Sequence, residues 1–155
     1  MTLAAFNAAP ADEALALMRT CCACDRFAAA MTAGRPYPSA DAAAAAAGTA
    51  FATLTWDDVR EAMDGHPRIG ARVSGQSAAE QAGVADGTRA ALHAGNAAYE
   101  ERFGHVFLVC ATGLSGEQML TALRHRLNND EQSERVVAAA ELRKITVLRV
   151  RKALA

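Results

Sequence analysis

His66 has the sequence surroundings of a catalytic side chain. It lies in the segment Gly65-His66-Pro67-Arg68-Ile69-Gly70, where Pro67 disfavours helical geometry for the residue before it. The imidazole is therefore presented from a stiff loop, and histidine is the side chain whose ordinary pKa lies nearest to neutrality. These features predict a general acid or base, while a turn histidine that bonds its own loop would have the same pattern. The other histidines lie in or beside expected helices and are assigned structural or solvated roles: His93, His105 and His125.

Glu80 and Arg149 are the charged residues whose positions could mark a ligand. Ser77-Ala78-Ala79-Glu80 has the pattern of a capping box, in which the glutamate is expected to reach back to the helix's first amide. Free amides at such a helix end also bind anionic or imide-like ligands. At 100° per residue, Arg149 falls between Leu142 and Ile145, inside the apolar arc of the last helix. Because an unpaired buried charge is costly, Arg149 must face a protein carboxylate or a ligand anion. Three other glutamates show no such feature and are expected to be solvated: Glu117, Glu134 and Glu141.

The cysteines and the metal motifs give little support to a metal or nucleotide cofactor. Cys21, Cys22 and Cys24 are crowded and Cys110 is distant, which fits neither a disulfide framework nor a repeated CxxC zinc pattern. We expect reduced thiols packed in the core, with a metal site formed by the three clustered cysteines and a histidine as the alternative. The sequence has no His-x-x-x-His, Glu-x-x-His, GxGxxG or GxxxxGK[ST] motif. An enzyme of this sequence would work with side chains alone.

Composition predicts one all-α domain over residues 1–155. Of the 155 residues, 39 are alanine and only 11 are valine or isoleucine, so helix propensity dominates. The net charge of −1 provides no basic field for nucleic acid, and no apolar run is long enough to span a membrane. The chain begins without a signal-like stretch and ends in Arg151-Lys152-Ala153-Leu154-Ala155 rather than Ser-Lys-Leu, which predicts a soluble protein of the cytoplasm.

The expected architecture is an irregular bundle of about eight helices. Apolar spacing, caps and breakers place helices over residues 12–31, 41–47, 55–65, 77–82, 86–104, 115–127 and 129–152. Three capping pairs mark helix starts: Thr55 with Asp58, Ser115 with Gln118, and Asn129 with Gln132. Four residues of the helix over 86–104 fall on one face: Leu92, Asn96, Tyr99 and Phe103. The alanine run at 42–47 is a good helix former with little to bury. Residues 105–111 are apolar but have no partner strand, so we expect a buried extended or helical segment.

An ordered set of motifs resembles the 2-oxo-4-hydroxy-4-carboxy-5-ureidoimidazoline (OHCU) decarboxylase family. The ordered set is far more specific than any single motif: His66-Pro67-Arg68-Ile69-Gly70, Ser77-x-x-Glu80-Gln81, Asn96-x-x-Tyr99-x-x-x-Phe103-Gly104-x-x-Phe107, Arg126-Leu127-x-Asn129 and Glu141-Leu142-x-Lys144-Ile145-x-x-x-Arg149. The resemblance covers nearly the whole chain, because Phe27 and Arg35-Pro36-Tyr37 resemble the family's N-terminal aromatic and Arg-Pro-Phe elements. The resemblance implies an all-helical, cofactor-free homodimer. It also implies an anionic ureidoimidazoline substrate, formed in urate breakdown and converted to (S)-allantoin.

The resemblance also assigns roles to individual residues. It makes His66 and Glu80 catalytic and Pro67 a substrate contact. Further contacts to the ring and ureido amides come from Ser77, Ala78, Ala79, Glu80 and Gln81, and main-chain contacts from Phe107, Leu108, Val109, Cys110 and Ala111. Arg149 would contact the substrate's anion, and no metal is implied. From the residues alone, two other classes stay open: a non-enzymatic helical interaction domain, and a small metal-binding bundle built on the clustered cysteines.

Overall fold

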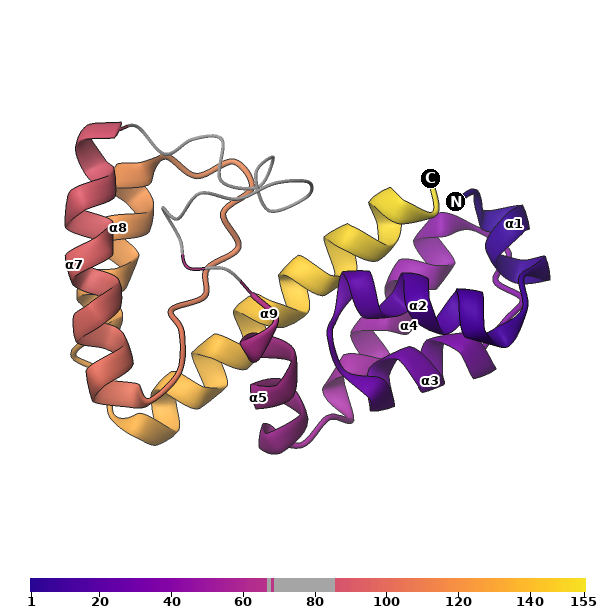
Figure 1. Cartoon of the computed structure of the whole chain (residues 1–155), viewed down its shortest axis with the longest axis horizontal. Helices are drawn as coiled ribbons and strands as arrows, with labels where there is room; N and C mark the ends of the chain where they lie inside the picture. Colours follow the sequence, from indigo (N-terminus) through magenta and orange to yellow (C-terminus); the bar gives the residue numbers. More distant parts are fainter. Residues whose placement is uncertain (67, 69–85) are drawn as a thin grey trace. The chain divides into compact units, whose positions relative to one another are not determined.

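The computed structural model describes residues 1–66, 68 and 86–155, and these residues form eight α-helices and no β-strand (Figure 1). The predicted all-α class is therefore confirmed. The chain divides into two compact units, each described below by itself. Unit 1 comprises Met1–Ala62 with Arg143–Ala155, and unit 2 comprises Met63–Leu142. None of the described helices is both long and apolar enough to cross a membrane. The expectation of a single domain over residues 1–155 stays a prediction.

Unit 1 is built from the N-terminal helices and the last turns of the C-terminal helix. Its helices are α1 (Leu3–Ala8), α2 (Ala11–Cys21), α3 (Asp25–Ala33), α4 (Ala40–Ala52), most of α5 (Trp56–Asp64) and the end of α9 (Glu131–Ala153). Helix α3 packs beside both α2 and α4 (Figure 1). Helix α5 begins at the predicted capping box, in which Asp58 N–H donates to Thr55 Oγ1 at 3.2 Å and Thr55 N–H donates to Asp58 Oδ2 at 3.0 Å.

The prediction of one helix over residues 12–31 is wrong, because the chain breaks at the cysteine cluster. Helix α2 ends at Cys21 and α3 begins at Asp25. Cys22 and Cys24 have extended backbones, with φ of −151° and −135°. Alternate residues of an extended chain point to the same side, so Cys22 and Cys24 are both buried while Ala23 is exposed. The expected core location of the three cysteines is confirmed.

Helix α4 buries more than its alanine run predicts. One face of it is almost fully enclosed, and its members recur at helical spacing: Ala43, Ala44, Ala47, Gly48 and Phe51. Arg143 of α9 reaches this face and donates from Nε to the carbonyl oxygen of Gly48 at 3.1 Å. The expectation that this stretch has little to bury is therefore wrong, since small side chains here allow close packing against a neighbouring helix.

Unit 2 contains the predicted helical pair that frames the 105–111 segment. Helices α7 (Asp86–Phe103) and α8 (Gly116–Arg126) lie side by side (Figure 1). The prediction that four residues share one face of α7 is confirmed, because all of them are buried: Leu92, Asn96, Tyr99 and Phe103. Ser115 and Gln118 form the expected capping box of α8.

The start of α9 differs from the prediction by one residue. The helix begins at Glu131, and the capping side chain is that of Asp130, whose Oδ1 accepts the Ser133 N–H at 2.8 Å. The sequence places Asn129 at this cap, but its side chain instead donates from Nδ2 to Glu134 Oε2 at 3.0 Å. Asn129 therefore joins the interior of unit 2 rather than the helix terminus.

Candidate active site

The predicted contact segment at residues 107–111 lies in the core of unit 2 without forming a helix or strand. Phe107, Leu108, Val109 and Ala111 are buried, and Cys110 is half-buried. Phe107 meets the ring of Tyr99 edge-on, with centroids 5.3 Å apart. The expectation of a buried segment is confirmed, and of its two offered conformations the helical one is excluded.

Two charged side chains hold the main chain of this segment. Arg126, the last residue of α8, donates from Nη1 to the carbonyl oxygen of Leu108 at 2.5 Å. Its guanidinium also lies over the Phe107 ring, 4.6 Å from the centroid. Glu141 of α9 accepts the N–H of Cys110 at Oε1 over 3.3 Å. The Leu108 carbonyl oxygen is thus bonded to a cation, and the Cys110 N–H, two residues later, is bonded to an anion.

Arg126 is itself fixed by a fully buried carboxylate. Glu134 has no exposed surface, and its Oε1 accepts a hydrogen bond from Arg126 Nε at 2.7 Å. Arg126 Nη2 lies 2.5 Å from the same oxygen, within ion-pair distance. The same oxygen accepts the Tyr99 hydroxyl at 2.6 Å, and Oε2 accepts Asn129 Nδ2. Burial, reinforced by the bond to Glu134, raises the pKa of the Tyr99 hydroxyl. The expectation that Glu134 is solvated is wrong, because its charge is balanced and hydrogen-bonded inside the core. Of the other two glutamates expected to be solvated, Glu117 is exposed and Glu141 is half-buried.

His66 lies two residues beyond the end of α5 and outside any helix, as the loop pattern predicts. His66 is half-buried, and its main-chain N–H donates to the carbonyl oxygen of Met63 at 2.9 Å. Two residues later, Arg68 forms a bidentate pair with Glu100 of α7, at 2.6 Å from Nε and 3.0 Å from Nη2. His66 and Arg68 both belong to unit 2, and Arg68 is paired with a helix of that unit.

Several predicted site residues lie outside the described residues. They are Pro67 and the whole serine and glutamate motif, Ser77, Ala78, Ala79, Glu80 and Gln81. Their assignments stay predictions.

Arg149 is buried in unit 1, as its angular position predicts, with 8% of its surface exposed. The apolar arc around it is only partly enclosed, since Leu142 and Ile145 are buried while Leu148 is 39% exposed. In two neighbouring thiols, Cys21 at the end of α2 and Cys22 just after it, burial raises the pKa and outweighs the lowering effect of the positive charge of Arg149. Burial raises the pKa of the Cys22 thiol to about 12, against the opposing effects of Thr146 and Arg149. Arg149 belongs to unit 1, whereas His66 and the 107–111 segment belong to unit 2.

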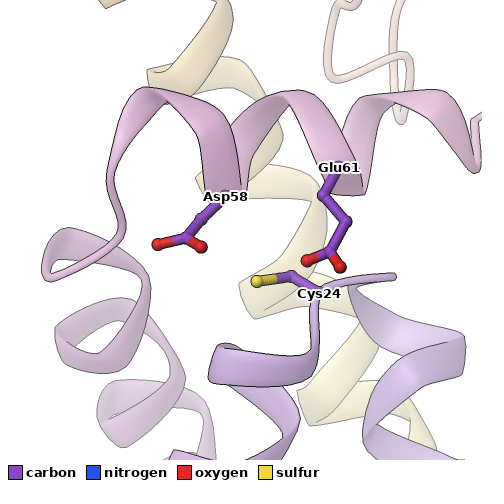
Figure 2. Close-up of side chains that lie close together, drawn as sticks. All are labelled: Cys24, Asp58 and Glu61. Carbon is purple, nitrogen blue, oxygen red and sulfur yellow. The ribbon is translucent and has the colours of Figure 1, made fainter.

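One group of side chains in unit 1 has the composition of a metal site. Figure 2 shows Asp58 and Glu61 extending from α5 toward Cys24, and their ligand atoms all lie within 4.8 Å of one another. Asp58 already has two partners. Its Oδ2 accepts the Thr55 N–H at the start of α5 and forms an ion pair with Arg26 Nη1 at 3.2 Å. Among the described residues this is the only such group. The metal-binding alternative requires Cys21, Cys22 and a histidine as well, and this group contains none of them.

A comparison with protein families gives a match along most of the chain. The model described as OHCU decarboxylase matches residues 7–151. The chain belongs to the OHCU decarboxylase family. The resemblance seen in the motifs is therefore confirmed.

Two curated relatives carry names from the same area of metabolism. The uric acid degradation bifunctional protein TTL of Arabidopsis thaliana is 33% identical over 146 residues, which cover 86% of this chain and 45% of the plant protein. This chain thus spans less than half the length of that relative. The 2-oxo-4-hydroxy-4-carboxy-5-ureidoimidazoline decarboxylase of Amia calva is 32% identical over 138 residues, covering 82% of this chain and 79% of the fish protein.

Two solved structures share the helical fold. A crystal structure of OHCU decarboxylase in the presence of (S)-allantoin is 32% identical, with a TM-score of 0.77 and coverage of 86% of this chain and 94% of that one. A crystal structure of (S)-allantoin synthase, 18% identical, has a TM-score of 0.73 and covers 99% of this chain and 54% of that one. The second likeness concerns the fold alone.

The sequence did not predict the buried ion pair of Arg126 and Glu134 in this member of the OHCU decarboxylase family. Arg126 and Asn129 enter the motif set, but Glu134 has the spacing of an exposed helix residue. One signal could have located it. Tyr99 lies on the apolar face of its helix, and a buried tyrosine hydroxyl needs a hydrogen-bond partner.

Proposed function

We propose that this chain catalyses the cofactor-free decarboxylation of OHCU to (S)-allantoin in urate degradation. The match of residues 7–151 to the OHCU decarboxylase family carries the proposal. Further support comes from the fish relative of that name and from the similar structure determined in the presence of (S)-allantoin. The position of His66, half-buried at the end of α5, suits a side chain that exchanges protons with a small molecule.

The proposed chemistry needs only side chains and main-chain groups. Loss of carbon dioxide leaves the electron pair of the broken bond on the ring carbon that carried the carboxylate, and the adjacent ring imine can accept that density. A proton is then added stereospecifically to the ring and the hydroxyl proton is lost, which gives (S)-allantoin. In our proposal His66 handles the hydroxyl or ring proton, and Glu80 orients His66 and the ring. Arg149 binds the substrate's carboxylate, since a guanidinium pairs well with a planar anion. The main chain of residues 107–111 contacts the polar edge of the substrate.

The catalytic role of His66 is tested with His66→Asn, using substrate generated freshly by the preceding enzymes. Formation of (S)-allantoin is followed by circular dichroism, since spontaneous decay yields the racemate. A positioned acid or base contributes about 10²- to 10⁴-fold, so we expect a loss of that size. His93→Asn, at an exposed histidine of α7, is the matched control and should retain the parent rate. Equal rates for His66→Asn and the parent would overturn the assignment.

A binding measurement separates an enzyme from a non-enzymatic interaction domain. Saturating (S)-allantoin should raise the melting temperature, because a ligand at a hundredfold excess over its Kd stabilises the folded state by about 2.7 kcal/mol. The increase should persist in Arg149→Ala, because (S)-allantoin lacks the carboxylate that Arg149 binds, while the KM for OHCU should rise in that variant. An interaction domain would show no increase with any ligand of the pathway.

The remaining features of the proposal concern assembly and location. We propose one functional domain over residues 1–155, because the family match runs through both units. We also propose that it acts as a cytoplasmic homodimer on an anionic ureidoimidazoline. The dimer is tested by light scattering of the purified protein, where a monomer mass would contradict it.

A further inference from the structure

The strongest unexplained feature of unit 2 is the amount of charge used to hold one short piece of main chain. Arg126 and Glu134 are both almost completely buried, with side-chain exposures of 6% and 0%. A buried ion pair is weak evidence for stability, because apolar residues of similar size often stabilise a core as well or better. A role in orientation explains the pair better than stability does.

The ion pair with Glu134 leaves Arg126 Nη1 available to bond to the 107–111 segment. Nε donates to Glu134 Oε1 and Nη1 donates to the Leu108 carbonyl oxygen, so the planar guanidinium has a fixed orientation between the two. A lysine could keep the charge pair with Glu134, but its single ammonium cannot reproduce the two-sided fork.

The two anchors determine where the polar groups of Val109 point. Among the described residues the only cis peptide is Arg35-Pro36, so the peptides flanking Val109 are trans. In a planar trans peptide the N–H and C=O point in opposite directions. Since Leu108 C=O points at Arg126, the Val109 N–H points away from Arg126. Since Cys110 N–H points at Glu141, the Val109 C=O points away from Glu141.

We propose that Arg126, oriented by Glu134, and Glu141 are positioning residues that fix the main chain of Val109 as a donor and acceptor pair for the substrate's amide groups. Neither charged residue needs to touch the substrate. This inference rests on the proposed function, because it names the residue of the 107–111 segment whose main chain would bind the ureidoimidazoline.

The principal test compares Arg126→Lys with Arg102→Lys in the full chain. Arg102 is a matched control because it also donates to a carbonyl oxygen, that of Asn129 at 2.6 Å, and lies over an aromatic ring, that of Phe103 at 4.9 Å. It is exposed and does not bond to the segment. Amide hydrogen exchange over residues 107–111 and steady-state kinetics with OHCU are measured for both variants and the parent.

We expect Arg126→Lys to speed amide exchange in the segment by about tenfold or more, without an equal change in the helices of unit 1. We also expect KM for OHCU to rise by about 10- to 100-fold, a change larger than that in kcat, because displacements of about 1 Å reduce productive binding on this scale. Arg102→Lys should stay close to the parent in both measurements. Unchanged exchange, or faster exchange with the parent's KM, would overturn the proposal.

Glu141 gives a second test that does not disturb the buried pair. Glu141→Gln keeps an oxygen acceptor for Cys110 N–H and should retain a KM close to that of the parent, while Glu141→Ala should raise both exchange and KM. Equal behaviour of the two variants would count against the inference, even if Arg126→Lys failed to fold. Absence of turnover by the parent chain would refute the proposed function, and the exchange measurements would then decide alone whether these residues fix the segment.

Discussion

Replacing Glu134 by leucine should destabilise the protein far more than a surface glutamate replacement of the same kind. Glu134 is fully buried and accepts hydrogen bonds from Tyr99, Arg126 and Asn129. Glu134→Leu leaves the Arg126 guanidinium buried without its counter-charge, and removal of one member of a buried pair costs about 3–5 kcal/mol. For a domain of this size that free energy corresponds to a fall in melting temperature of about 6–20 °C.

Glu131→Leu is the matched control on the same helix. Glu131 also pairs with an arginine, Arg135, at 2.8 Å, but its side chain is 69% exposed. Exposed pairs of this kind contribute about 0.3–0.5 kcal/mol, so the control should change stability little. Urea denaturation followed by far-ultraviolet circular dichroism measures both variants against the parent.

The comparison has a clear refuting result. If Glu134→Leu and Glu131→Leu lose the same small free energy of unfolding, the buried network does not carry the charge balance described above. Because a loss of 5 kcal/mol could exceed the stability of a marginal domain, Glu134→Gln is measured as well. It removes the charge but keeps an oxygen acceptor, and we expect a loss between those of the two leucine variants.

Two further predictions concern the cysteine cluster and the end of α7. The pKa of the Cys22 thiol in the folded protein, about 12, lies above its ordinary value of 9.0. The contribution of the protonated thiol to the free energy of unfolding is therefore complete below pH 9 and is lost as the pH rises toward 12. Cys22→Ala should therefore reduce the alkaline fall of the unfolding free energy by up to about 1.4 kcal/mol per pH unit, and parallel curves in urea denaturation would contradict this. Gly104 has φ of +76° with open space around its Cβ position, so Gly104→Ala should cost about 1–2 kcal/mol through backbone strain alone. Gly104→Asn should recover part of that loss in thermal unfolding, whereas an unchanged Gly104→Ala would contradict the strain argument.

The elements that local chemistry specifies were predictable from the sequence. Thr55 with Asp58 and Ser115 with Gln118 each place a helix start correctly, because a capping box involves residues only three apart. The break at Cys22–Cys24 was not predictable in this way. It contains no glycine or proline, and it is stabilised by the burial of two thiols that only the tertiary fold provides.

The candidate site shows the same division between local and long-range information. The loop of His66 and the burial of Arg149 follow from a proline, two glycines and a helical angle. The burial of Glu134 depends on Arg126, which lies eight positions earlier on another helix. No periodicity within α9 distinguishes such a glutamate from its exposed neighbours, so its role required the three-dimensional structure.

The alanine run of α4 has a consequence for how this chain tolerates insertions and deletions. Six identical side chains cannot tell one helical register from the next, so the register must be fixed at the ends. At the start, Ser39 Oγ accepts the Ala42 N–H at 3.0 Å, and beyond the run Arg143 bonds to Gly48. Deleting any one alanine would rotate Gly48 and Phe51 by about 100° relative to the cap. The loss of one residue from a repeat, which looks neutral in the sequence, would therefore turn the buried face of this helix away from its partner.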